Sequence, residues 1–91
     1  MKTHETEHFT VNLKNENQIV LCISRDRDAR NGTVLMDGNA DEMLTLLGMA
    51  VCEFLDVAIK EGMNRHVAIS GVWAAFEAGV KTHTKYDEGV Q

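Results

Sequence analysis

The longest apolar stretch of the chain covers residues 43–59, MLTLLGMAVCEFLDVAI, and is typical of a helix. Asn39 and Glu42 stand just before it with the spacing of a capping box, in which each side chain accepts a hydrogen bond from the backbone of the other. Gly62 follows the stretch and is a common residue just after a helix end. We therefore predict a helix from Ala40 to Glu61.

A second helix is predicted to begin after Asn64, which is a suitable N-cap, and to end near Lys81. Small residues recur every four positions along it and form a ridge that another backbone can approach: Gly71, Ala75 and Gly79. Its large apolar residues recur at helical spacing on one face: Ile69, Val72, Trp73, Phe76 and Val80. The link between the two helices is short, which predicts an antiparallel helical hairpin.

The first part of the chain alternates apolar and polar residues with the period of β-strands, over residues 9–13, 18–24 and 33–36. Asn31-Gly32 predicts a tight hairpin turn before the last strand. One apolar face of the sheet should carry Phe9, Val11, Leu13, Ile19, Leu21 and Ile23. We expect an α+β fold in which a three-stranded antiparallel meander precedes the two helices. The domain would cover residues 9–81, between a flexible N-terminal tail (1–8) and a polar C-terminal tail (82–91).

The first helix carries more apolar surface than one small domain can cover. At about 100° per residue, its apolar residues occupy roughly two-thirds of the circumference, which is wider than an ordinary core-facing stripe. A domain of 91 residues also buries only about 60–65% of its unfolded surface. We therefore expect a homodimer or a higher closed oligomer, with an interface that includes Met43, Leu47, Phe54 and Trp73. The alternative is a monomer whose helices clasp both faces of the sheet.

Composition excludes several classes of function. The net charge of −5 argues against a nucleic-acid binder that works by bulk charge. Glu53 and Asp56 interrupt the longest apolar run, so no stretch predicts a membrane span, and the N-terminus has no apolar secretory segment. We therefore expect a cytoplasmic protein in which Cys22 and Cys52 are free thiols.

Residues 4–8 read His-Glu-Thr-Glu-His and match the HExxH pattern of zinc proteases. That chemistry needs both histidines on one face of a supported helix, whereas this segment is polar and leads into a predicted strand. We therefore expect no metal site there and no cofactor elsewhere. The chain also has no GxSxG, no P-loop and no GxGxxG motif, so an enzyme would need a site built between subunits.

The most distinctive polar segment is RDRDAR at residues 25–30. If the strand continues to the turn, Arg25 and Arg27 share one face and Arg30 lies on the other. Guanidinium groups near a turn can bind phosphate or carboxylate, and Arg65 stands where a helix N-terminus can hold an anion. The alternatives are a solvated hairpin tip in which arginines and aspartates screen one another, and simple capping at the second helix.

The layout resembles small accessory proteins of bacteriophages and prophages, on the basis of residues 38–59, with a capped entry GNADEMLTLL leading into apolar helices. Many such proteins bind and neutralise host factors or signalling molecules. The resemblance implies a non-catalytic homo-oligomeric binding protein that recognises a host protein or a small anionic ligand. The alternatives are a structural protein whose role is assembly itself, and a small enzyme with its site at a subunit interface.

Overall fold

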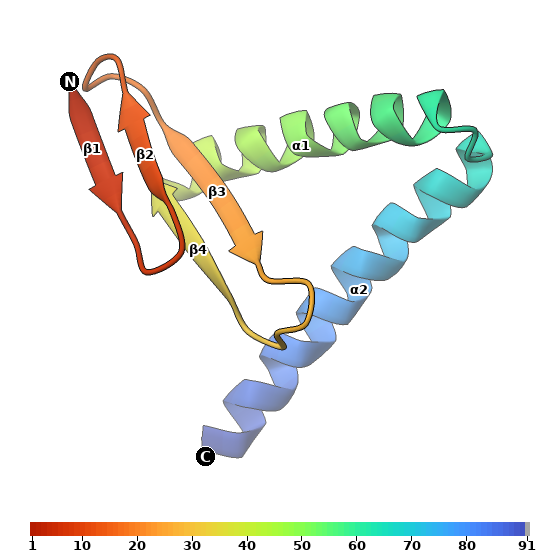
Figure 1. The fold of residues 1–91 in the computed structure, drawn as a ribbon. Coiled ribbons are helices and arrows are strands. Elements are labelled where there is room, and N and C mark those ends of the chain that lie inside the picture. Colours follow the sequence, from red (N-terminus) through yellow and green to blue (C-terminus); the bar gives the residue numbers. More distant parts are fainter. Residues whose placement is uncertain (91) are drawn as a thin grey trace. The chain divides into compact units, whose positions relative to one another are not determined.

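The computed structural model describes the backbone of residues 1–90 and the side chains of residues 1–85. Four strands are followed by two helices (Figure 1): β1 (Lys2–Glu5), β2 (Thr10–Leu13), β3 (Val20–Arg25), β4 (Gly32–Asp37), α1 (Ala40–Lys60) and α2 (Arg65–Val90). The chain forms two compact units, Met1–Met49 and Ala50–Gln91, and the boundary between them falls inside α1. The fold class is therefore α+β, as predicted.

The strands form two separate antiparallel sheets, so the predicted three-stranded meander is wrong. β1 pairs with β2, from Lys2 opposite Leu13 to Glu5 opposite Thr10. β3 pairs with β4, from Val20 opposite Asp37 to Arg25 opposite Gly32. The segment that we assigned to an N-terminal tail thus supplies a strand, and its residues, KTHE, contain no apolar side chain that would reveal one.

The β3–β4 hairpin is confirmed, but the tight turn predicted at Asn31-Gly32 is wrong. The strands are joined by the six residues 26–31, and the chain reverses where the Ala29 N–H donates to the Asp26 carbonyl at 3.1 Å. Gly32 instead opens β4, where an added Cβ would lie 2.5 Å from the Ser24 carbonyl oxygen. Glycine is needed at this position because the two strand backbones approach closely there.

Two glycines, one in β4 and one in α2, should respond to alanine in opposite ways. Gly32→Ala is expected to destabilise the protein by about 1–3 kcal/mol, the usual cost of forcing a methyl group into occupied space. Gly71→Ala is expected to stabilise it by about 0.4–1 kcal/mol, because position 71 lies inside α2 and an added Cβ meets nothing within 4 Å. Urea unfolding followed by circular dichroism measures both changes, and equal signs would contradict the description of these two positions.

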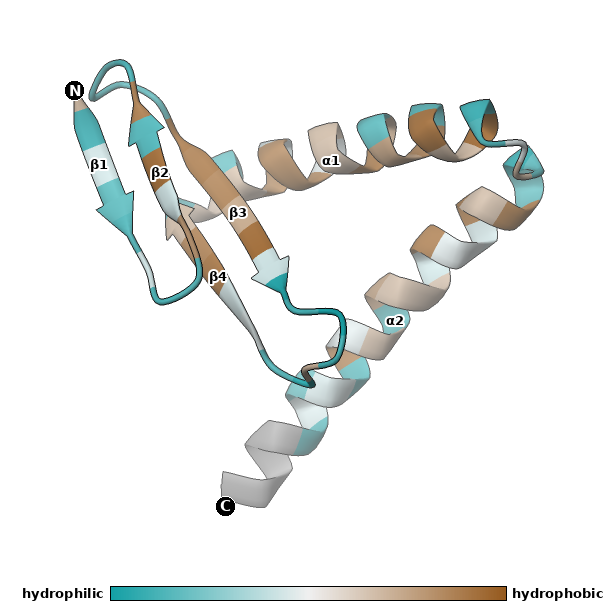
Figure 2. Ribbon diagram, in the orientation of Figure 1, coloured by the Kyte–Doolittle hydropathy of each residue, from teal (hydrophilic) through white to brown (hydrophobic). Residues whose placement is uncertain are grey.

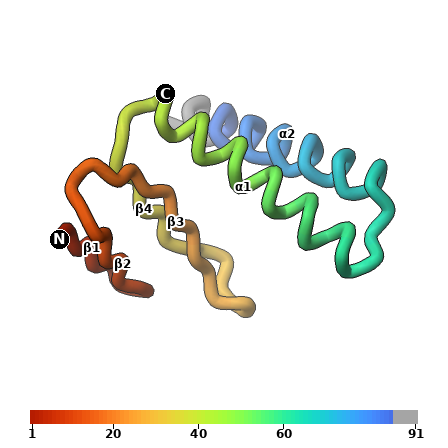
Figure 3. The backbone as a smooth tube through the Cα atoms, turned by 90° about the horizontal axis from the view of Figure 1, so that it is seen from above, coloured from red at the N-terminus to blue at the C-terminus, as the bar shows by residue number. Residues whose placement is uncertain are grey.

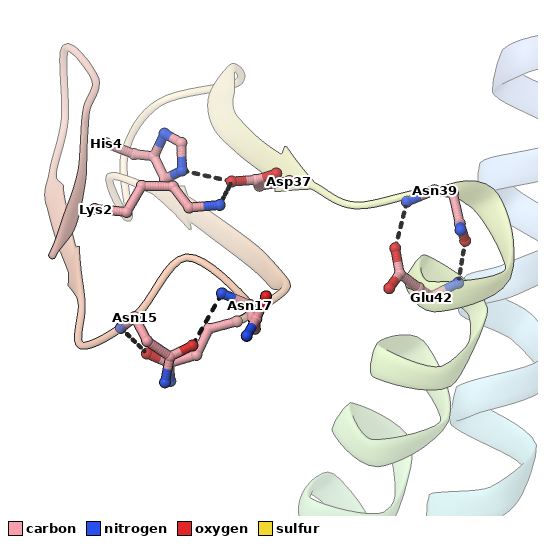
Figure 4. A network of polar contacts seen from close by, with 8 residues as sticks. Lys2, His4, Asn15, Asn17, Asp37, Asn39 and Glu42 are labelled. Carbon is pink, nitrogen blue, oxygen red and sulfur yellow. Dashed lines mark hydrogen bonds and ion pairs between the residues drawn. The ribbon is translucent and has the colours of Figure 1, made fainter.

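The ends of the helices are capped as predicted. The Asn39 N–H donates to Glu42 Oε1 at 2.8 Å, and the Glu42 N–H donates to Asn39 Oδ1 at 2.9 Å (Figure 4). Gly62 has a φ of +94° just after α1, and Asn64 Oδ1 accepts the His66 N–H at 2.9 Å at the start of α2. The sequence therefore contains complete signals for both starts and for the end of α1.

α2 continues to Val90, beyond the end predicted near Lys81. Residues 82–90 are mostly polar, and a helix that is polar around its circumference leaves no apolar period in the sequence. The hydroxyl groups of Thr82 and Thr84 donate to the carbonyls of Ala78 and Val80, which keeps these side chains compatible with the helix. Figure 3 shows the short connection between α1 and α2.

Very few side chains are buried. Within the described side chains, the buried apolar residues are Leu13 and Val20 in the first unit, and Ala58 and Ala68 in the second. In β3, Val20 is 8% exposed whereas Ile23 is 67% exposed, so the face that carries Val20 is the more covered one. Side chains of β1 lie on this side, since Lys2 and His4 bond to Asp37, which lies directly opposite Val20.

Candidate functional site

One face of the β3–β4 hairpin is apolar and exposed. Directly opposed residues of an antiparallel pair lie on the same face, so Leu21 and Met36 share a face with Ile23 and Val34. Of these four, only Leu21 is partly covered. Figure 2 shows the apolar colouring of both strands.

This face leads to an apolar groove where β4 passes into α1. The groove has a volume of about 500 Å³ and is lined by Met36, Gly38, Asn39, Ala40, Met43, Leu44 and Leu47. The capping box fixes the first turn of α1 and so positions the methionine and leucine side chains of that turn and the next. The volume lies within the range of about 300–1,000 Å³ that is usual for sites that enclose a bound group.

The residues predicted for an oligomer interface fall into two groups. Met43 and Leu47 both line the groove of the first unit, and Met43 is the more covered of the two. Phe54 and Trp73 are exposed apolar side chains of the second unit. Trp73 contacts Phe76 on the same helix in an edge-to-face arrangement, with ring centroids 6.4 Å apart and an interplanar angle of 85°.

The arginines predicted to bind an anion are exposed. β3 ends at Arg25, so the strand alternation that would place Arg25 and Arg27 on one face does not extend to Arg27. Arg25, Arg27 and Arg30 form no ion pair with Asp26, Asp28 or any other acidic residue among the described side chains. Arg65 begins α2 and belongs to the second unit. Arg25 thus ends β3, and Arg27 and Arg30 lie in the loop that follows it.

A polar cluster that sequence reasoning missed joins β1 to β4. Lys2 Nζ and His4 Nε2 lie 2.7 and 2.8 Å from the same oxygen of Asp37, Oδ2 (Figure 4). The imidazole of His8 is also hydrogen-bonded to the hydroxyl of Thr33. Half-buried Lys2 and His4 alternate with exposed Thr3 and Glu5, but this alternation is seen only in the structure, because all four residues are polar.

The HExxH segment therefore holds two hairpins together. His4 lies in a strand, whereas the zinc-protease motif requires a helix. Among the described residues, no group of three or more histidine, cysteine, aspartate or glutamate side chains is arranged to hold a metal ion. Hydrogen bonds from Lys2 and then His4 lower the pKa of Asp37 below its ordinary value of 3.8.

Asp37 should make stability depend on pH. Because its pKa is lower in the folded state, its contribution is present above the unfolded value of 3.8 and is lost as the pH falls through the folded value. Asp37→Asn should lower the free energy of unfolding at pH 7 and have a much smaller effect once Asp37 is protonated in both states. Urea titrations at several pH values measure this difference, and an equal loss at every pH would contradict the role given to the carboxylate.

Comparisons of this chain with family models, with curated proteins and with solved structures found no match. Among the described residues, no helix is both long enough and apolar enough to cross a membrane.

Proposed function

We propose that this chain is a non-catalytic binding protein that works as a homo-oligomer. The observation that supports the proposal is the exposure of large apolar side chains in both units, on β3, β4, α1 and α2. Among the described residues no large side chain is fully buried. Each large side chain that becomes fully buried in an assembly gains about 1.5–3 kcal/mol relative to leaving it in water. Association of copies would cover these apolar side chains, and so would closure of one chain upon itself, which is the monomeric alternative.

Thermal unfolding at different concentrations separates these two alternatives. If only the assembled chain is fully folded, the midpoint of unfolding should rise with protein concentration, because mass action favours the oligomer. We expect such a rise between micromolar and hundred-micromolar samples. A midpoint that stays constant over this range would overturn the proposal in favour of a self-covered monomer.

The second part of this proposal is that the protein binds a small anion. The observation that favours it is the set of three arginines around the loop 26–31, whose guanidinium groups make no ion pair with the described side chains. Guanidinium forks suit phosphate and carboxylate groups. The resemblance to phage accessory proteins extends the proposal to a host protein or a phosphate-containing signalling molecule as the bound partner. A purely structural assembly protein and an enzyme with a site between subunits are the competing proposals.

Inorganic phosphate and pyrophosphate are suitable probes of this loop. Either anion should raise the midpoint of thermal unfolding if it binds the folded state. Arg25→Ala combined with Arg27→Ala should abolish that rise and leave the midpoint without anion unchanged. Lys14→Ala combined with Lys60→Ala removes the same charge elsewhere and serves as the matched control. A rise that survives in the arginine variant would show that the anion binds at another place.

A further inference from the structure

The two faces of the β3–β4 hairpin differ in how far they are covered. Val20 lies on one face and is 8% exposed. Cys22 and Leu35 oppose each other on the same face and are half-buried. On the opposite face, Ile23 is 67% exposed and Val34 is 56% exposed. Because successive residues of a strand point to opposite faces, another part of the chain must lie over the face that carries Val20.

The β1–β2 hairpin lies over this covered face and contacts it near both ends of β4. At one end, Lys2 Nζ and His4 Nε2 lie 2.7 and 2.8 Å from Asp37 Oδ2 (Figure 4). At the other end, the imidazole of His8 is hydrogen-bonded to the hydroxyl of Thr33. The two contact points lie four residues apart on the same face of β4, so the half-buried pair described above lies between them.

No backbone hydrogen bond joins the two hairpins among the described residues, because their strands form two separate sheets. The connection between them is polar and exposed over residues 14–18. A part of a protein that is held by few contacts can open at a lower free energy than the whole chain needs to unfold. The β1–β2 hairpin therefore has the features of a unit that opens separately.

We propose that β1–β2 is a cover that opens as one unit from β3–β4, and that Asp37 keeps it closed. Opening exposes the face that carries Val20, Cys22 and Leu35. The cover thus controls access to a second apolar face of the hairpin and to the thiol on it. This inference concerns one chain and does not depend on the proposed homo-oligomer, because every contact that supports it lies within the first unit.

Asp37 is the shared acceptor of both bonds from β1, so one substitution weakens the two contacts together. The hydrogen bonds from Lys2 and His4 also lower the pKa of Asp37, which agrees with a stabilised carboxylate. The three side chains are between 26% and 32% exposed, so water partly screens their charges. We therefore expect removal of the carboxylate charge to raise the population of the open form by about threefold to tenfold.

Labelling of Cys22 by N-ethylmaleimide at pH 7 measures this opening. The chain has two cysteines, and Cys52→Ser at an exposed position leaves Cys22 as the only thiol. In this background Cys22 should react far more slowly than in the urea-unfolded chain. Asp37→Asn and Lys2→Met should each raise the rate about threefold to tenfold. Asp28→Asn, the matched control, removes the same charge from the exposed loop after β3 and should leave the rate unchanged.

Low concentrations of urea distinguish opening of the cover from unfolding of the whole chain. Below the unfolding transition, the labelling rate should depend only weakly on urea, because opening exposes a small area. A rate that follows global unfolding over the whole range would overturn the proposal, since the cover would then not open separately.

The remaining outcomes also decide the matter. Equal rates for Asp37→Asn and Asp28→Asn would exclude Asp37 as the residue that keeps the cover closed. Labelling of Cys22 in the parent chain as fast as in the unfolded chain would show that β1–β2 does not cover it. A rate that falls as the protein concentration rises would show that another copy of the chain, and not β1–β2, protects the thiol.

Discussion

Leu13→Ala is expected to cost about 2–5 kcal/mol, the usual range for removing a buried leucine side chain. Leu13 is at the end of β2 and is 8% exposed, and only Val20 is comparably buried among the large side chains of the first unit. A domain of this size has only a few kcal/mol of stability to lose. The variant should therefore show a large fall in the urea midpoint at a fixed protein concentration.

Val34→Thr is the matched control for Leu13→Ala. Val34 lies in the middle of β4 and is more than half exposed, and threonine keeps its β-branched shape. The control should change the free energy of unfolding by less than about 0.5 kcal/mol, as exposed substitutions usually do. If Leu13→Ala behaved like Val34→Thr, the burial described for Leu13 would be contradicted.

Ala68→Asp should be the most damaging single change in the second unit. Ala68 is 1% exposed, so an aspartate there would carry a charge into a buried position. Leaving a buried charge without a partner lowers the free energy of unfolding by about 3–5 kcal/mol, which is enough to unfold a domain of marginal stability. Far-ultraviolet circular dichroism should report a loss of helix at 25 °C.

Ala74→Asp is the control for Ala68→Asp, because it introduces the same residue into the interior of the same helix. Ala74 is exposed, so its variant should lose only the difference in helix propensity, about 0.7 kcal/mol or less. A folded Ala68→Asp variant with the stability of Ala74→Asp would contradict the burial of Ala68.

Local signals predicted the helices well. The capping box of Asn39 and Glu42, the glycine at position 62 and the cap at Asn64 each satisfy backbone groups within a few residues, so short sequence windows contain all the necessary information. The sheets were harder, because β1 has no apolar residue and is held by Asp37, which is 35 residues away from Lys2. Long-range pairing of this kind leaves no local pattern.

The candidate sites, like the fold, could be predicted from the sequence only in part. The excess of apolar residues in α1 was visible in the sequence, and the exposure of Leu44, Leu47 and Phe54 agrees with it. The groove could not be predicted from the sequence, because it is lined both by Met36 of β4 and by residues from the first turns of α1. The sequence indicated the arginines as candidates for binding an anion, but it did not predict how they are arranged. The turn at Asp26–Ala29 ends β3 earlier than the Asn31-Gly32 pair suggested.

Sedimentation equilibrium of the wild-type protein over a wide range of concentrations tests the central claim most directly. The account predicts a mass of at least twice the 10.1 kDa of one chain, decreasing toward the single chain only on strong dilution. A constant mass of one chain from the lowest to the highest concentration would contradict it, because the exposed apolar faces would then need no second copy.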